Sequence, residues 1–247
     1  MNIGILGLGT IASAVVHGIA QDGHVIRTSQ RSAAQAERLS AQYANVTPME
    51  NQEVIDQSDV IFLGLMPDRA QEMLPQLRFR SGQQVISFMA SLSLEDVQAC
   101  VAPATASCIM IPFPAIAQGG SVIPVLGQDD MVHSLFGARN HVTVLHNAQE
   151  MDALLCAQAV LSPVTQMVAS AAQWLEENGL EAQRGEPFLR MLIASGLMQS
   201  EAKALLTSLA TPGGFNESLR EHMNDAGMRE DLREGLDHLL AWHKGQG

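Results

Sequence analysis

Short, largely apolar runs alternate with stretches of helical spacing in the first half of the chain. The predicted strands are residues 3–6, 25–26, 60–63, 85–88, 107–111, 121–127 and 141–145. The predicted helices among them are residues 11–21, 33–43, 68–74 and 129–136. Apolar runs of this length are typical of strands buried on both faces. The alternation predicts parallel pairing, because a parallel return needs a crossover segment.

The pattern changes after residue 147, where helical spacing replaces the alternation. The predicted helices are residues 151–177, 186–198, 200–209 and 215–242, punctuated by Pro163, Asn178-Gly179 and Thr211-Pro212-Gly213-Gly214. We therefore predict an α/β protein with an N-terminal Rossmann-type doubly wound sheet domain over residues 1–147. An all-α dimerisation and substrate domain is expected over residues 148–247. A homodimer or higher homo-oligomer is expected, because one small domain could not cover these apolar helices.

Composition narrows the class of function. Hydrophobic residues make up 47% of the 247 residues and charged residues 16%, which is enough for a large core. The 14 basic and 26 acidic residues give a net charge of −12, which disfavours nucleic acid and anionic membranes as partners. The longest apolar run, residues 60–67, is far shorter than the roughly 20 residues of a membrane span. The N-terminus does not match a signal peptide.

The cysteines and histidines suggest no metal centre. Cys100, Cys108 and Cys156 show no CxxC spacing, so we expect reduced thiols and a cytoplasmic location. The eight histidines form no HxH or HExxH pattern. A small-molecule substrate is the expected partner.

A glycine-rich turn follows the first predicted strand. Gly7-Leu8-Gly9-Thr10-Ile11-Ala12 matches G-x-G-x-x-A between a strand and a helix. Gly7 suits a tight turn, Gly9 allows close approach of a pyrophosphate, and Ala12 lets the helix pack on the strand. Residues 7–11 are therefore predicted to bind a dinucleotide at the positive end of the helix.

The end of the second strand predicts the type of dinucleotide. An NAD site usually has an acidic residue about 20 positions after the glycines, for the ribose hydroxyls. Ser29-Gln30-Arg31 contains none, and a guanidinium with nearby hydroxyls suits a 2′-phosphate. We predict NADP(H), with Ser29 and Arg31 at the phosphate. The alternative is that Arg31 is a solvated residue at a helix start.

Two later strand ends are predicted to line the nicotinamide half of the cofactor. Leu65-Met66-Pro67 and Ala90 follow the strands at residues 60–63 and 85–88. Ligands of doubly wound folds sit at the carboxyl ends of strands. Ordinary turns at strand ends remain the alternative.

A second glycine pair lies between two predicted C-terminal helices. Gly213 and Gly214 precede a helix start, whose free amides could bind a carboxylate, and Asn216 adds a side-chain amide. A plain interhelical turn is the alternative. Ser162 and Thr165 are weaker substrate candidates, with capping of a helix start as the alternative.

The chain resembles the pyrroline-5-carboxylate reductase family in the order of its motifs. After the glycine turn and the arginine come Leu65-Met66-Pro67, residues 86–90, residues 109–112, Thr211-Pro212-Gly213-Gly214 and residues 224–227. The resemblance covers nearly the whole chain. It implies a Rossmann domain, a helical dimerisation domain, and hydride transfer from NADPH to the C=N carbon of a cyclic imine, giving proline. It also implies an active site between the cofactor domain of one subunit and the helices of its partner.

The chain departs from the family pattern around the substrate. Where the family usually has a threonine after Pro-Gly-Gly, this chain has Phe215 and Asn216, and Met66 and Phe113 replace the usual lysine and asparagine. We predict an NADPH-dependent reductase of a small carboxylated imine. Alternatives are another Rossmann oxidoreductase, acting on a hydroxy or keto acid, and a non-catalytic NADP-binding protein. A 3-hydroxyacid dehydrogenase is disfavoured, because Lys203 and Lys244 do not fit G-x-x-x-K.

Overall fold

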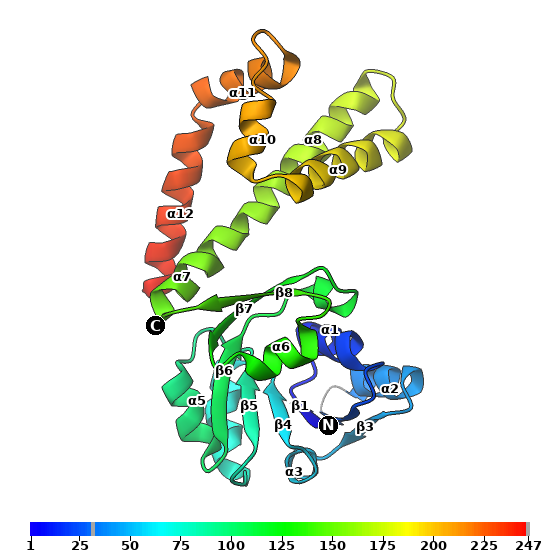
Figure 1. The fold of residues 1–247 in the computed structure, drawn as a ribbon, viewed down its shortest axis with the longest axis vertical. Coiled ribbons are helices and arrows are strands. Elements are labelled where there is room, and N and C mark those ends of the chain that lie inside the picture. The colour runs from blue at the N-terminus through cyan, green and yellow to red at the C-terminus, as the bar shows by residue number, and fades with distance from the viewer. Residues whose placement is uncertain (31–32, 246–247) are drawn as a thin grey trace. The chain divides into compact units, whose positions relative to one another are not determined.

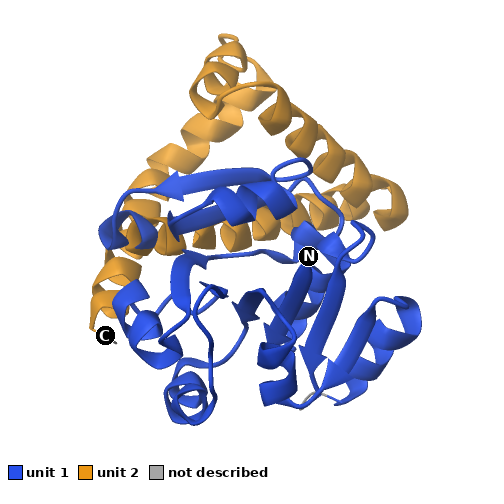
Figure 2. Ribbon diagram, turned by 60° about the horizontal axis from the view of Figure 1, so that its bottom comes forward, with its two compact units in different colours: residues 1–151 blue, residues 152–247 orange. Residues whose placement is uncertain are grey.

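The computed structural model divides the chain into two compact units, residues 1–151 and residues 152–247 (Figure 2). The structure describes residues 1–30 and 33–245. The division falls four residues beyond the joint expected from the sequence, between residues 147 and 148. It lies within α7 (Ala148–Ala157), so a helix joins the units.

The first unit is built on an eight-stranded sheet with the order β3-β2-β1-β4-β5-β6-β7-β8 (Figure 1). The strands are β1 (Asn2–Leu6), β2 (Val25–Ser29), β3 (Val46–Met49), β4 (Val60–Leu63), β5 (Gln84–Ser87), β6 (Thr105–Met110), β7 (Val122–Gly127) and β8 (His141–Leu145). Its helices are α1 (Thr10–Ile19), α2 (Ala33–Gln42), α3 (Asn51–Asp56), α4 (Pro67–Met73), α5 (Leu94–Val101) and α6 (Asp130–Phe136). The order reverses beside β1, as in Rossmann folds, which confirms the predicted α/β class.

One strand pair differs from the parallel arrangement expected. β7 runs antiparallel to β6, while β8 returns parallel to β7. The segment between β6 and β7 contains only a 3₁₀ turn, Pro114–Ala117, and no crossover helix. A strand that follows without a crossover pairs antiparallel.

Three elements of this unit were absent from the sequence prediction, namely β3, α3 and α5. β3 contains Pro48, which lowers a strand prediction, but β3 is the edge strand, where a missing N–H is tolerated. α3 and α5 have only six and eight residues. Helices of that length show too little periodicity to be recognised from apolar spacing.

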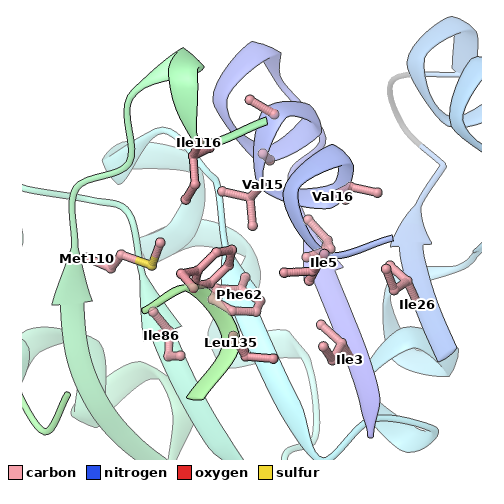
Figure 3. Close-up of a cluster of buried hydrophobic side chains, with 14 of the residues drawn as sticks. Ile3, Ile5, Val15, Val16, Ile26, Phe62, Ile86, Met110, Ile116 and Leu135 are labelled. Atoms are coloured by element: carbon pink, nitrogen blue, oxygen red, sulfur yellow. The ribbon is translucent and has the colours of Figure 1, made fainter. Parts of the chain in front are cut away.

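Two hydrophobic clusters hold the sheet, one on each face. The first gathers side chains from α1, α2 and α6 on strand residues such as Ile3, Ile5 and Phe62. Figure 3 shows Phe62 surrounded by Ile86, Met110 and residues of the covering helices. The second cluster packs α3, α4 and α5 on the other face. Burying one such side chain contributes about 1.5–3 kcal/mol, so the strand ends are fixed by the core.

The second unit consists of helices. They are α8 (Leu161–Glu177), α9 (Ala182–Gln199), α10 (Ala202–Ser208), α11 (Phe215–Asp225) and α12 (Met228–Lys244), preceded by the end of α7. The single helix predicted over residues 215–242 is wrong, because Gly227 at φ +97° separates α11 from α12. His243 Nε2 lies 3.1 Å from Asp152 Oδ1 and ties the end of α12 to α7.

α7 continues into α8 through a 3₁₀ turn, Gln158–Val160, so residues 148–177 form one helical stretch. Pro163 does not end this stretch, because it falls in the first turn of α8, where a proline is tolerated. Within the part of the chain that the structure describes, this one stretch meets the length and composition of a membrane span. The sequence predicts no span, because polar residues interrupt this stretch and its uninterrupted apolar runs are short.

Candidate functional site

Four turns of the first unit meet at the carboxyl edge of the sheet. Leu6 pairs with Leu63, and Leu63 pairs with Ser87, so β1, β4 and β5 end side by side. β2 ends next to β1 on the other side. The predicted cofactor segments, Gly7–Ile11, Ser29-Gln30, Leu65–Pro67 and Ala90, follow these strand ends. The fold therefore brings the described members of the predicted set to one edge.

Gly7 is required by the geometry of the turn. Its φ is +84°, and a Cβ there would lie 2.4 Å from the carbonyl oxygen of Gly64. Its N–H donates to Ser29 Oγ at 3.0 Å. Ser29 is only 2% exposed, so its hydroxyl fixes the turn from within the unit. The sequence predicts Ser29 at a phosphate, and its bond to the Gly7 N–H is a further role that the sequence pattern does not indicate.

Gly9 has a different environment. It is the N-cap residue of α1, with φ −89° and ψ −171°, and a Cβ there would meet no atom within 4 Å. No side chain caps α1, and its first turn carries no acidic residue. The amides at the start of α1 are thus available to an anion, and open space lies beside Gly9. The turn fits the pyrophosphate of a dinucleotide.

The neighbours of Gly9 contribute in different ways. The Leu8 side chain is 2% exposed and packs into the first cluster, so only its backbone can reach a ligand. Thr10 is exposed and Ile11 is half-buried. Their backbone amides open α1.

The turns after β4 and β5 are shaped by their helices and neighbours. Pro67 is the first residue of α4, where its missing N–H leaves no helix bond unmade. Met66 is 72% exposed beside it, and Leu65 is half-buried. Ala90 follows β5 and is half-buried. These residues share the edge with the glycine turn, and their role toward a nicotinamide remains a prediction.

The end of β2 carries an acidic neighbour that sequence reasoning missed. Ser29 pairs with Met49 of β3, so Gln30 and Glu50 each follow a paired position. Gln30 Nε2 donates to Glu50 Oε1. The sequence shows no acid at the end of β2, and β3 is not among the predicted strands, so Glu50 is absent from the predicted site. Arg31, the predicted phosphate ligand, lies outside the described residues.

The predicted substrate turn lies in the second unit. Gly213 has φ +72°, and Gly214 is the N-cap of α11. Gly213 N–H donates to Glu217 Oε2 at 3.0 Å, so a carboxylate of the chain itself binds one amide of this turn. Asn216 is exposed, and the side chain of Phe215 is 96% exposed. Glu217 was not among the predicted site residues.

Ser162 and Thr165 lie together on the first turns of α8, and both are exposed. Thr165 Oγ1 donates to the carbonyl oxygen of Leu161 at 2.7 Å, within its own helix. α11 lies well away from this start of α8 (Figure 1). One copy of the second unit therefore does not bring these two residues to the Pro-Gly-Gly turn.

Among the residues that the structure describes, the groups with displaced pKa values are outside the predicted cofactor segments. Burial, together with the negative charge of Asp129, raises the pKa of the Cys108 thiol to about 12. Hydrogen bonds from Asn2 and Arg80 lower the pKa of Asp59, which precedes β4 at the opposite edge. Across residues 1–30 and 33–245, no three His, Cys, Asp or Glu side chains are grouped to hold a metal ion.

Comparisons with known proteins agree with this architecture. Residues 2–91 match the family described as NADP oxidoreductase coenzyme F420-dependent. "Pyrroline-5-carboxylate reductase 2" of Bacillus subtilis (strain 168) is 23% identical to this chain, and the match covers 93% of this chain and 89% of the relative.

Solved structures extend the comparison to the fold. The 1-pyrroline-5-carboxylate reductase of Streptococcus pyogenes matches with a TM-score of 0.83 and 20% identity, over 98% of each chain. The Plasmodium falciparum pyrroline carboxylate reductase with NADP bound matches with a TM-score of 0.81 and 16% identity, over 100% of this chain and 98% of the other. In sequence the chain is thus similar to a pyrroline-5-carboxylate reductase, and it shares the fold of such enzymes.

Proposed function

We propose that the protein is an NADPH-dependent oxidoreductase that reduces the C=N bond of a small carboxylated cyclic imine. The observation that carries the proposal is the glycine turn at the carboxyl edge of the sheet. Gly7 holds the turn and Gly9 leaves open space before uncapped amides of α1. The family match of residues 2–91 to NADP oxidoreductases supports the same cofactor.

NADPH supplies the hydride when it is bound. The chain's task is to hold the nicotinamide and the acceptor carbon in line, because orientation accounts for much of the rate in such reactions. Leu65, Met66, Pro67 and Ala90 are proposed to line the nicotinamide half. A protonated imine is already electrophilic, so no strong side-chain acid is required.

The substrate carboxylate is proposed to bind at Gly213, Gly214 and Asn216. Backbone amides at a helix start favour an anion, and the contact between Gly213 N–H and Glu217 Oε2 supports the turn's capacity to bind a carboxylate. Ser162 and Thr165 are the secondary candidates.

The protein is further proposed to act as a homodimer or higher homo-oligomer through its C-terminal helices. Met191 and Met198 of α9 are 64% and 87% exposed, so neither packs in a core of the single chain. An apolar groove of about 750 Å³ runs between α8 and α12. A second copy is favoured over a bilayer because the chain carries a net charge of −12. A monomeric mass at micromolar concentration would argue against this assembly.

The test of the function is oxidation of NADPH, followed at 340 nm, with pyrroline-5-carboxylate and a panel of cyclic imines. Turnover with a carboxylated imine is expected. Tight NADPH binding without turnover on any imine would favour the non-catalytic alternative. Turnover with hydroxy or keto acids alone would favour a different Rossmann oxidoreductase.

Two variants test the assigned residues. Arg31→Ala should weaken NADPH binding far more than NADH binding, and an equal loss would remove Arg31 from the phosphate. Asn216→Ala should raise KM for a carboxylated imine at unchanged cofactor affinity. An unchanged KM would remove Asn216 from the substrate site.

A further inference from the structure

Glu50 stands at the edge of the sheet where the adenosine ribose of a dinucleotide would bind. β2 and β3 are parallel, with Ser29 paired to Met49, so Gln30 and Glu50 leave the sheet next to each other. In Rossmann folds the residue at the end of the second strand meets the ribose. Both side chains are exposed, and the amide of Gln30 donates to the carboxylate of Glu50.

The position of Glu50 is held from two sides. Gln30 binds its side chain, and the backbone N–H of Glu50 donates to Glu53 Oε2 at 3.3 Å. Glu50 is also the N-cap residue of α3, with an extended backbone at φ −66° and ψ 151°. The chain thus presents a carboxylate at this edge, although β2 itself carries no acid.

We infer that Glu50 is a specificity-determining residue that limits the preference for NADPH over NADH. The inference rests on the proposed function. A carboxylate accepts hydrogen bonds from the ribose hydroxyls of NADH, as the acid of an NAD site does. The same charge repels a 2′-phosphate. Gln30 strengthens the effect, because its amide keeps the carboxylate at the ribose position.

Glu50→Gln tests the inference by binding, measured by calorimetry with NADPH and with NADH. Repulsion between like charges of about −1 and −2 at roughly 6 Å in water accounts for about a tenfold effect. The variant should therefore bind NADPH about tenfold more tightly. Its NADH affinity should fall about threefold, since an amide oxygen is a weaker acceptor than a carboxylate. The NADPH gain should shrink as salt rises from 0.05 to about 0.5 M, where charges are screened.

Glu53→Gln is the matched control. It removes the same charge from the same helix, while the amide oxygen of the glutamine can still accept the hydrogen bond from the Glu50 backbone N–H, so Glu50 keeps its position. It should change the ratio of the two affinities by less than about twofold, and thermal unfolding should show both variants folded. An unchanged ratio in Glu50→Gln, or an equal change in Glu53→Gln, would overturn the inference and leave the proposed function standing. If the wild-type protein binds neither nucleotide, both fail.

Discussion

The two glycines of the N-terminal turn should respond in opposite ways to the same substitution. Gly9→Ala places a methyl group in space where no atom lies within 4 Å, at a backbone conformation that alanine adopts freely. Gly7→Ala places it 2.4 Å from the carbonyl oxygen of Gly64, at φ +84°. We therefore expect Gly9→Ala to impair cofactor binding alone and Gly7→Ala to impair folding.

The sizes follow from these environments. At Gly9, alanine is a poorer N-cap than glycine, which lowers the free energy of unfolding by about 0.5–1 kcal/mol. Alanine also reduces the conformational entropy of the unfolded chain, which raises the free energy of unfolding by a similar amount. The free energy of unfolding should stay within about 0.5 kcal/mol, while a methyl group in the path of the pyrophosphate should weaken NADPH binding at least about tenfold, or 1.4 kcal/mol. At Gly7, a positive φ costs about 1–3 kcal/mol, and the backbone clash adds to it.

Thermal unfolding and calorimetric titration with NADPH separate the two effects. A loss of about 3 kcal/mol in Gly7→Ala corresponds to a fall in Tm of about 6–12 °C for a chain of this size. Gly9→Ala should keep the wild-type Tm without ligand and lose much of the Tm increase that NADPH produces. Wild-type NADPH affinity in a folded Gly9→Ala variant would refute the assignment of the open space to a pyrophosphate.

Four further predictions concern bonds and groups away from Gly9. Ser29→Ala removes the acceptor of the half-buried Gly7 N–H, so the free energy of unfolding in urea should fall by about 0.5–1.5 kcal/mol; unchanged stability would mean that the bond is dispensable. Glu217→Gln removes a negative charge from the Pro-Gly-Gly turn and should lower KM for a carboxylated imine about threefold to tenfold; an equal effect with an uncharged imine would exclude this cause. Cys108 should resist alkylation at pH 8 while half-buried Cys100 reacts. Because burial raises the pKa of Cys108 from 9.0 to about 12, its folded form retains the proton. The free energy of unfolding should then decrease from about pH 9 to pH 12, less so in Cys108→Ala.

The elements predicted correctly were those in which apolar residues in the sequence correspond to buried positions in the structure. β4 is a continuous apolar run that the structure buries at every position, and β5 buries its apolar pair, Val85 and Ile86. The glycine turn combined a motif with its position between a strand and a helix, so its location at the sheet edge followed from the topology. The break in the last helix was missed, although Gly227 marks it, because apolar spacing continues on both sides.

The parts of the candidate site that were missed depend on neighbours distant in sequence or on side-chain bonds. Glu50 reaches the end of β2 only because β3 pairs there, and β3 contains a proline that obscured it. Ser29 looks like a phosphate ligand in sequence, yet its hydroxyl is buried on Gly7. A glutamate three positions after an N-cap is a known capping signal, which could have pointed to Glu217.

The proposed cofactor turn at Gly7 is constrained by folding more strongly than the proposed substrate turn at Phe215. Gly7 cannot change without disturbing the packed sheet, so the cofactor turn is tied to folding. Phe215 is 96% exposed, so its replacement by a smaller residue removes little buried surface within the chain. Stability of the single chain therefore does not explain an exposed phenylalanine beside the turn, whereas contact with a substrate or a second copy would. If Phe215→Thr leaves Tm and oligomeric mass unchanged but shifts kcat/KM among imines of different size, the phenylalanine serves substrate selection.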